Sequence, residues 1–358
     1  MLPIPAATMD IYCIDPTQDE RWEQFLRAHP DASLFHSSAW LKALHATYGY
    51  RPLLLTTSAP NQPITAGIPF CSIQSWITGS RLVSVPFSDH CQPLVDRQEA
   101  NRGIWEVFPQ LLEREHCNYI ELRSVTRDVS WLRQTGFAQC ATFIHHQLDL
   151  RRPLSVLFDR LHKSCVQRKI RRAEREGLVY SEGTSDELLN QFYSLQALTR
   201  RRHGMPAQPL SWFRNLRDFL GDTLKVRLAL RDGRPIASIL TVRYKDTLVY
   251  KYGCSECTSH KFGPMPFLFW ETIQRAKSDG AVQFDLGRSD SDQEGLIAFK
   301  EHMGAAASTL TYYRYPAKTA NSSRLGAFMR RPLVSAWSAR LPSILLRVAS
   351  KLLYRHMA

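Results

Sequence analysis

The feature of this sequence that most constrains its fold is the segment from residue 282 to residue 300. Its apolar start, 282–286, predicts a buried strand, and Gly287 follows where the backbone is expected to turn sharply. Ser291 and Glu294 have the S-x-x-E spacing of a capping box, so we predict that a helix begins at residue 292. The segment therefore predicts a strand, a glycine turn and a short helix that ends in lysine.

Lys300 lies in the last turn of this predicted helix, directly after Phe299. A cation held near the end of a strand can meet a phosphate, a carboxylate or a developing oxyanion. The alternative is that Lys300 only complements the negative end of the helix. Asp285 ends the strand and is either a proton acceptor or a residue that shapes the turn.

The composition is that of a globular chain. Its 358 residues leave room for about two domains, and 44% of them are hydrophobic and 22% charged. No run approaches the roughly 20 apolar residues of a membrane span. The first residues lack the basic and apolar regions of a signal peptide, so we expect a cytoplasmic protein.

The net charge of +13 is concentrated in two stretches. Residues 318–358 contain eight Lys or Arg and no acid, and residues 151–176 contain nine Lys or Arg against three acids. In the tail at 318–358, apolar and basic residues separate onto opposite faces of a predicted amphipathic helix. This pattern favours peripheral contact with the inner face of an anionic membrane. The alternative is a helix that packs back on the protein with a solvated basic face.

The cysteine pattern predicts reduced thiols and no metal centre. The eight cysteines follow no regular framework. Cys254 and Cys257 form a C-x-x-C pair, with His260 three residues later. Three ligands do not close a structural zinc site, so no metal is expected.

Hydrophobic periodicity predicts a mixed α/β (α+β) fold in which the two halves repeat one order of elements. In the first half, strands are expected at 9–14, 51–57, 64–73, 81–85, 119–122 and 141–150, and helices at 18–28, 38–47 and 100–115. In the second half, strands are expected at 178–181, 224–231, 235–244, 247–252, 282–286 and 309–315, and helices at 155–176, 186–202, 211–220 and 264–278.

The second half offers groups that amide formation requires. The loop 253–263 precedes a helix whose N-terminus is a natural site for phosphate. Transfer of an acyl group from an ester or thioester needs a neutral amine and a stabilised tetrahedral oxyanion. Asp285 or His260 could accept the proton, and Lys300 or strand amides could meet the oxyanion. His260 could equally be an ordinary loop histidine.

Two groups of cations are candidates for binding an anionic substrate. The helix predicted at 155–176 carries Arg168 and Arg172 among its basic residues. This face is either a docking surface for a phosphorylated substrate or an RNA backbone, or a solvated charged face. Arg201 and Arg202 end the helix predicted at 186–202, in a cluster of cations before a Gly-x-Pro turn.

The ordered motifs resemble the FemAB-like branch of the GNAT acyltransferases. The residues that carry the resemblance are Lys169-Ile170-Arg171-Arg172-Ala173-Glu174, Arg201-Arg202-His203-Gly204-Met205-Pro206, Asp232-Gly233-Arg234-Pro235-Ile236-Ala237, Tyr252-Gly253-Cys254-Ser255 and Phe284-Asp285-Leu286-Gly287 through Phe299-Lys300. The resemblance implies tandem GNAT-like domains, each a central sheet flanked by helices, at 1–150 and 151–317, followed by the tail. It places Tyr252 and Gly263 among the substrate-binding residues and Phe299-Lys300 beside a substrate phosphate or the oxyanion.

The resemblance also implies an activity: transfer of an acyl or aminoacyl group to an amine of a phosphorylated or lipid-linked cell-envelope precursor, related to peptidoglycan or exopolysaccharide. The donor stays open between aminoacyl-tRNA and acyl-coenzyme A. The window His260-Lys261-Phe262-Gly263-Pro264-Met265 matches the usual coenzyme A motif only at Gly263, and Pro264 removes one backbone amide. The alternatives are a coenzyme A-dependent N-acyltransferase acting on an amino sugar and a non-catalytic module that binds an anionic polymer or lipid.

Overall fold

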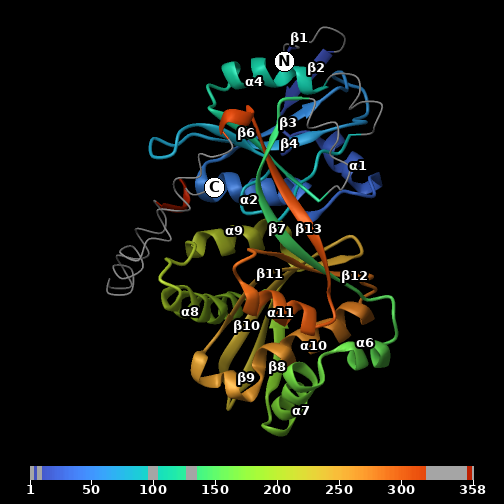
Figure 1. The fold of residues 1–358 in the computed structure, drawn as a ribbon, viewed down its shortest axis with the longest axis vertical. Coiled ribbons are helices and arrows are strands. Elements are labelled where there is room, and N and C mark those ends of the chain that lie inside the picture. Colours follow the sequence, from blue (N-terminus) through green and yellow to red (C-terminus); the bar gives the residue numbers. More distant parts are fainter. Residues whose placement is uncertain (1–3, 6–9, 96–103, 126–134, 320–352, 357–358) are drawn as a thin grey trace. The chain divides into compact units, whose positions relative to one another are not determined.

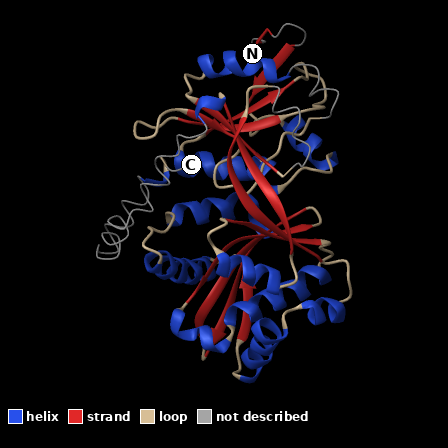
Figure 2. Cartoon of the chain, viewed as in Figure 1, coloured by secondary structure: helices blue, strands red, loops and turns tan. Residues whose placement is uncertain are grey.

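The computed structural model of the chain describes residues 4–5, 10–95, 104–125, 135–319 and 353–356 (Figure 1). The chain divides into two units by its internal contacts. Among the described residues, unit 1 comprises those up to Thr142 together with 309–319 and 353–356, and unit 2 comprises Phe143–Ser308. Each unit combines strands with helices (Figure 2), which confirms the predicted mixed α/β class. Among the described residues, no helix has the length and apolarity that crossing a membrane requires.

Unit 1 has a sheet in the order β1-β2-β3-β4-β5-β6-β13. Its strands are β1 (Ile4–Pro5), β2 (Asp10–Ile14), β3 (Arg51–Thr56), β4 (Ile68–Ile73), β5 (Arg81–Val83), β6 (Tyr119–Ser124) and β13 (Ala306–Tyr315). Neighbouring strands are antiparallel except β5 and β6, which are parallel. The strands predicted between residues 9 and 122 are therefore confirmed, with shifted ends.

The helices of unit 1 are α1 (Glu20–Ala28), α2 (Ser38–Tyr48) and α4 (Phe108–Arg114), with the 3-10 segments η1 (Leu34–His36) and η2 (Ile104–Val107). The Asp19 carboxylate caps α1 by accepting the Arg21 amide at 3.1 Å. Trp22 is fully buried, and its indole N–H donates to the carbonyl of His36 at 2.9 Å. Segments η2 and α4 bury Trp105 and Phe108 in a cluster with strand residues. Both groups of helices are thus fixed to the sheet by large aromatic side chains.

A buried ionic cluster joins the last strand of the chain to unit 1. Glu121 on β6 accepts bonds from Arg123 at 3.0 Å and from Arg314 on β13 at 2.9 Å. The division by contacts therefore differs from the expected boundaries at 150 and 317, since Thr309–Tyr315 was expected in the second domain. The physical reason is that a strand is placed by its hydrogen-bonded neighbour, here β6, and not by the element before it in sequence.

Unit 2 has a second sheet, in the order β7-β12-β11-β10-β9-β8. Its strands are β7 (Ala138–Asp149, in this unit from Phe143 on), β8 (Val179–Gly183), β9 (Leu224–Arg231), β10 (Arg234–Tyr244), β11 (Thr247–Ser255) and β12 (Gln283–Ser289). Strands β11 and β12 are parallel, and the other neighbours are antiparallel. The predicted three-strand meander is confirmed, and its first turn places Asp232 and Gly233 at positive φ as a tight hairpin requires.

Helices cover both faces of this sheet (Figure 1). Helices α8 (Asp186–Arg202) and α9 (Leu210–Leu220) pack through buried aromatic residues such as Phe192 and Phe213. On the other face, α10 (Pro264–Ser278) packs into a hydrophobic core with α6 (Leu154–Arg160) and α7 (Arg168–Arg175). The partly buried Phe299 of α11 (Glu294–His302) packs against the same core. The predicted helices at 186–202, 211–220 and 264–278 are confirmed.

The basic helix predicted at 155–176 is wrong as a single element. Helix α6 ends at Arg160, Leu161 is extended (ψ 140°), a π-helical segment η3 runs over Lys163–Gln167, and α7 follows. Leu161 is buried, and the backbone N–H of His162 donates to the carbonyl of His302 at 2.9 Å. Tertiary contacts thus interrupt a stretch in which local sequence alone favours a continuous helix.

The predicted capping box is also wrong. Helix α11 begins at Glu294, and its N-cap residue Gln293 makes no capping bond through its side chain. Strand β12 continues to Ser289, so Gly287 lies inside the strand at φ +69°. The pairing with β7 shifts between Asp285 and Arg288, which makes this position a β-bulge rather than the end of the strand.

Most of the tail at 318–358, including most of the predicted amphipathic helix, lies outside the described residues. Within residues 353–356, Tyr354 and His356 are buried in unit 1. Tyr50 donates to the carbonyl of Tyr354 at 2.9 Å, and Arg81 donates to that of His356 at 3.2 Å. The described part of the tail therefore packs back on the protein.

We predict that Glu121→Gln lowers the free energy of unfolding at pH 7 by about 3–5 kcal/mol, because it removes the carboxylate that compensates two buried guanidinium groups. Burial raises the pKa of Glu121, but Arg123 and Arg314 outweigh burial and hold that pKa below 4.5. The stabilisation is therefore complete above about pH 4.5 and is lost as the pH falls through the folded-state pKa.

Urea unfolding at pH 7 and at several pH values below 4.5 measures this effect. The exposed Glu113→Gln is the matched control and should change the unfolding free energy by less than about 0.5 kcal/mol. A Glu121→Gln variant as stable as the control at pH 7 would contradict the prediction.

Candidate functional site

A strongly basic hollow of about 690 Å³ lies between α7 and the 3-10 segment η5 (Cys257–Phe262) of unit 2. Its lining consists of Arg168, Lys169, Arg172, Arg175, Glu176, His260 and Lys261. Three of these residues, Arg168, Arg172 and His260, are among those that the sequence singles out. The structure thus brings together a proposed base and two proposed anion-binding cations.

The single acid of this lining is held by cations on either side. Glu176 lies 3.5 Å from Nε of Arg172 and 3.6 Å from Nη2 of Arg231. The hollow therefore keeps a net positive charge, and its wall concentrates the positive potential over a small surface. Such a site attracts phosphate or carboxylate groups.

Gly263 fixes the distance between the two walls. It precedes α10 with φ +73°, and a Cβ atom at this position would lie 2.6 Å from the carbonyl oxygen of Lys169. Only glycine allows this approach, since both the φ value and the space exclude a side chain. Gly263 thus shapes the hollow by letting the start of α10 press against α7.

The N-terminus of α10 has few backbone donors for a ligand. Pro264 and Pro266 lack an amide hydrogen, and Phe267 donates its own amide to the carbonyl of Gly263 at 3.2 Å. Met265 is left as the one donor among the first three helical residues. An anion in this region is therefore bound by the side chains of α7 and η5 more than by the helix terminus.

His260 is held in the hollow by its neighbours and is neutral at pH 7. Its Nε2 atom lies 2.8 Å from the hydroxyl of Ser255, whose backbone N–H donates to Thr199 at 3.2 Å. Burial lowers the pKa of His260 below 6.5, and the positive charges of Arg202 and Lys169 lower it further. A neutral imidazole beside cations is able to accept a proton.

The predicted arginine pair lies at the end of α8, close to the His260 loop. Arg202 donates to the carbonyl of Ser255 at 3.5 Å and contacts the Cys257 thiol. Arg201 is exposed on the same helical turn. The structure therefore places Arg202 next to the His260 loop and leaves Arg201 facing solvent.

Cys254 and Cys257 have different surroundings. The Cys254 thiol is buried and lies 3.7 Å from the carbonyl of Phe192, whereas Cys257 is exposed. Burial raises the pKa of the Cys254 thiol well above its usual value, so it stays protonated. The C-x-x-C pair and His260 are occupied by separate structural contacts.

Tyr252 belongs to the core between the sheet and helices α8 and α9. Its hydroxyl accepts the indole N–H of Trp212 at 2.8 Å, and its ring lies 5.1 Å from that of Phe213. It is not among the residues that line the hollow. Its substrate-binding role stays a prediction.

Asp285 is part of a second buried cluster, where β12 meets β7. One carboxylate oxygen, Oδ1, lies 2.9 Å from Nε2 of His145 and accepts the backbone N–H of Gly287 at 2.7 Å. Asp285 is 3% exposed. In this arrangement the carboxylate shapes the bulge at Gly287, and its role as a base stays a prediction.

Lys300 is 2% exposed and fastens α11 to the same bulge. Its amino group donates to the carbonyl oxygens of Gly287 at 2.9 Å and Arg288 at 3.0 Å. Phe299 packs edge-on against Phe269 of α10, with the ring centroids 5.2 Å apart. The Phe299-Lys300 pair is therefore anchored on both sides.

Sequence reasoning missed His146, which is fully buried near Lys300. Among the described residues, neither ring nitrogen of His146 has a hydrogen-bond partner. Burial lowers its pKa to about 4, and the Lys300 ammonium contributes to the shift. The available signal was the His145-His146 pair inside the predicted strand at 141–150. Arg175, a further basic residue of the hollow, follows Arg168 and Arg172 at helical spacing.

Comparison with known proteins agrees with this architecture. Residues 161–301, which include Lys300 and the residues that line the hollow, match the family described as the acetyltransferase (GNAT) domain. These residues are therefore similar to a GNAT acyltransferase domain. The predicted resemblance to FemAB-like GNAT acyltransferases is confirmed, and with it the assignment of the chain as an acyltransferase.

The chain is similar to other proteins over most of its length. UDP-N-acetylmuramoylpentapeptide-lysine N(6)-alanyltransferase of Weissella viridescens is 27% identical over 80% of this chain and 89% of its own length. The crystal structure of FemX has a TM-score of 0.68 and 14% identity, covering 86% of this chain and 97% of that one. A tandem GNAT protein from the clavulanic acid biosynthesis pathway has a TM-score of 0.56 and 12% identity, covering 85% and 97%. The predicted tandem GNAT-like fold is thereby confirmed.

We predict that Lys300→Met lowers the free energy of unfolding by about 1–3 kcal/mol, because two buried carbonyl groups lose their donor. It should also raise the pKa of His146 from about 4 toward 6.5, since the ammonium that disfavours the imidazolium is removed. Urea unfolding and an NMR titration of the histidine rings measure the two effects.

Lys277→Met is the matched control. Lys277 also donates to two carbonyl groups, those of Leu150 at 2.7 Å and Arg151 at 3.3 Å, but it does not affect His146. An unchanged His146 titration in Lys300→Met, or an equal change in Lys277→Met, would contradict the assignment.

Proposed function

We propose that this protein transfers an aminoacyl group to an amine of a peptidoglycan precursor, and that unit 2 carries out the chemistry. The observation that carries the proposal is the basic hollow of the GNAT domain, where several cations surround a neutral histidine. The Weissella viridescens relative is named as an alanyltransferase acting on a UDP-linked pentapeptide lysine. A substrate of that kind combines phosphate groups with a reactive amine, and the hollow can bind the first while the imidazole serves the second.

The sparse amides at the start of α10 favour aminoacyl-tRNA over acyl-coenzyme A as the donor. Coenzyme A binding at a helix N-terminus uses successive backbone N–H groups around its pyrophosphate. Here Pro264 and Pro266 remove two of the first three. Arginine side chains on α7 instead suit the phosphates of an RNA backbone or a nucleotide.

His260 is our candidate for the proton acceptor. The acceptor amine attacks the ester carbonyl carbon, a new C–N bond forms, and a tetrahedral oxyanion results. His260 takes the proton that the nitrogen loses, and the same proton passes to the departing ribose oxygen as the C–O bond breaks. The net change is one amide formed and one ester consumed.

Lys300 and Asp285 are proposed to hold the edge of the reaction site. Lys300 adds positive potential at the bulge of β12, where an oxyanion would be stabilised, while Asp285 keeps the Gly287 bulge in place. Phe299 supports Lys300 from the side of α10. Peripheral membrane contact through the tail, and an exopolysaccharide precursor as the acceptor, remain further proposals.

Two alternatives are tested by the same assay. The purified protein is incubated with UDP-N-acetylmuramoylpentapeptide or with an amino sugar as the acceptor and with either aminoacyl-tRNA or acyl-coenzyme A as the donor, and the acceptor is analysed by mass spectrometry. We expect a product heavier by one aminoacyl residue with the tRNA donor. A product formed only with acyl-coenzyme A on an amino sugar would replace the proposal by its rival. Tight anion binding without a product from any donor would favour the non-catalytic module.

We predict that the double variant Arg168→Gln/Arg172→Gln raises KM for the phosphorylated ligand at least tenfold, with a smaller change in kcat. Each cation lost from the hollow weakens ground-state binding of phosphate, so the salt dependence of KM should also become shallower. Steady-state kinetics at several salt concentrations provide the measurement. Arg152→Gln, an exposed cation of the same unit outside the hollow, should leave KM within about twofold.

We predict that the acidic limb of the kcat/KM profile has its midpoint below pH 6.5, because only neutral His260 accepts a proton and its pKa is lowered. The part of the activity that depends on neutral His260 is therefore complete near neutrality and is lost as the pH falls through the pKa of His260. His260→Gln should lower kcat by about 100-fold or more and remove this limb. His203→Gln is the control, since His203 is also exposed and also has a lowered pKa but does not line the hollow. An acidic limb that persists in His260→Gln would assign it to another group.

A further inference from the structure

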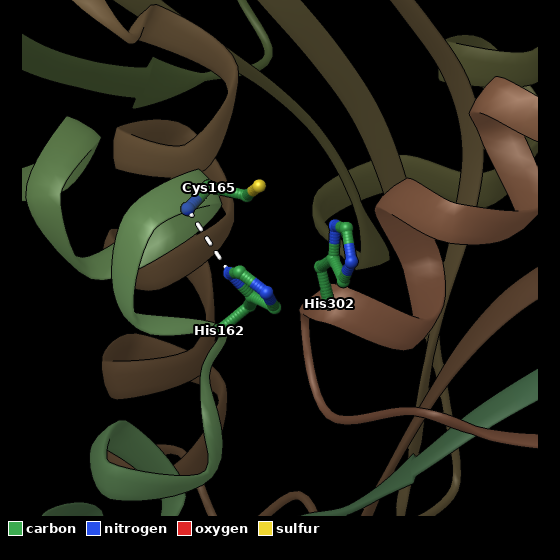
Figure 3. Close-up of side chains that lie close together, drawn as sticks. All are labelled: His162, Cys165 and His302. Carbon is green, nitrogen blue, oxygen red and sulfur yellow. Dashed lines mark hydrogen bonds between the residues drawn. The ribbon is translucent and has the colours of Figure 1, made fainter.

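We propose that His162, Cys165 and His302 form a binding site for Zn²⁺ that is separate from the basic hollow. One ligand atom from each residue lies within 4.8 Å of the other two. Figure 3 shows the three side chains facing one another, with His162 and Cys165 on one side and His302 on the other. Residues 140 positions apart in sequence thus supply a single cluster.

The backbone holds the two halves of this cluster in register. His162 is the N-cap of the π-helical segment η3, Cys165 lies inside it, and His302 is the last residue of α11. The backbone N–H of His162 donates to the carbonyl of His302 at 2.9 Å, and the imidazole centroids are 4.3 Å apart. This hydrogen bond holds the backbones of His162 and His302 next to each other. Metal binding therefore costs little further conformational entropy.

The donor set selects the metal. One thiolate and two imidazoles are the ligands that Zn²⁺ prefers, and hard cations such as Mg²⁺ or Ca²⁺ favour oxygen donors instead. Three protein ligands leave the fourth tetrahedral position for water or an exogenous group. His162 is exposed and the other two residues are half-buried, so a metal ion can enter from solvent.

Binding exchanges one hydrogen bond for coordination. Nδ1 of His162 accepts the backbone N–H of Cys165 at 3.1 Å, and the hydroxyl of Ser164 lies 3.4 Å from the same atom and is displaced with it. A metal at Nδ1 takes over that lone pair, whereas a metal at Nε2 requires the imidazole proton to move to Nδ1 and end this bond. The Cys165 thiol loses its proton to solvent in either case, so the affinity rises with pH.

A metal here would connect two parts of the GNAT domain that matter for the chemistry. Helix α11 carries Phe299 and Lys300, and η3 leads directly into α7, which lines the hollow. Zn²⁺ would fasten the end of one helix to the start of the other. The proposal rests on this cluster alone and stands whether or not the proposed acyl transfer is correct.

The test uses the full chain with any histidine tag removed, reduced and freed of metal, and then titrated with Co²⁺ or Zn²⁺ alone. We expect one metal ion per chain, a thiolate-to-cobalt charge-transfer absorption with Co²⁺, and a higher Tm with Zn²⁺. Cys165→Ser should abolish the charge-transfer absorption, and His302→Gln should weaken Zn²⁺ binding by about 100-fold or more.

Control variants exclude general effects of thiols and imidazoles. The controls are Cys117→Ser and His116→Asn. These two residues are adjacent to each other in unit 1 and belong to no such cluster among the described residues, so both variants should bind metal like the unchanged protein. Thermal unfolding without metal verifies that each variant is folded. Charge-transfer absorption that survives in Cys165→Ser, equal losses in the controls, or the absence of stoichiometric binding by the unchanged protein would each overturn the proposal.

Discussion

The arrangement of the GNAT domain depends on the hydrogen bonds that the buried amino group of Lys300 donates. An ammonium at 2% exposure is tolerated only with partners, and the carbonyl oxygens of Gly287 and Arg288 supply them. Those carbonyls are available because β12 bulges at Gly287. Helix α11 is thereby fixed to the strand, and its last residue, His302, in turn accepts the amide of His162. That bond lies where the basic stretch breaks between α6 and η3, and η3 leads into α7, which lines the hollow.

The electrostatics of the hollow follow from this placement. A continuous helix over 155–176 would distribute its cations around a longer axis, whereas the short α7 presents Arg168, Arg172 and Arg175 beside η5. Gly263 lets α10 approach α7 closely, and burial together with the positive charges of Arg202 and Lys169 lowers the pKa of His260. A site of this kind binds anions through side chains and offers an unprotonated imidazole next to them. These are the two properties that acyl transfer to an amine of a phosphorylated precursor requires.

Elements governed by local sequence could be predicted well. The Asp232-Gly233 turn requires positive φ at two positions, so the meander around it was predictable, and the boundaries of α8 follow from its Ser185 cap and its periodic apolar face. Candidate site residues were predicted by type, and Arg168, Arg172 and His260 do meet in one hollow. The capping box predicted at Ser291 was wrong. Helix α11 begins at Glu294, after the bulged strand β12 has continued to Ser289, so the local preference of Ser291 did not set the start of the helix. The buried His146 was missed because no pattern in one strand shows what packs against it from a distant helix.

The sequence by itself determined the class of fold, the order of strands and helices, and the family resemblance, because apolar periodicity and turn chemistry act over a few residues. Only the tertiary structure decided that β13 pairs with β6, that the basic helix breaks at Leu161, and that His302 meets His162 and Cys165. Each of these depends on hydrogen bonds or packing between segments far apart in the chain. The energy of such contacts overrides local preference, and a single sequence does not indicate which distant segments will form them.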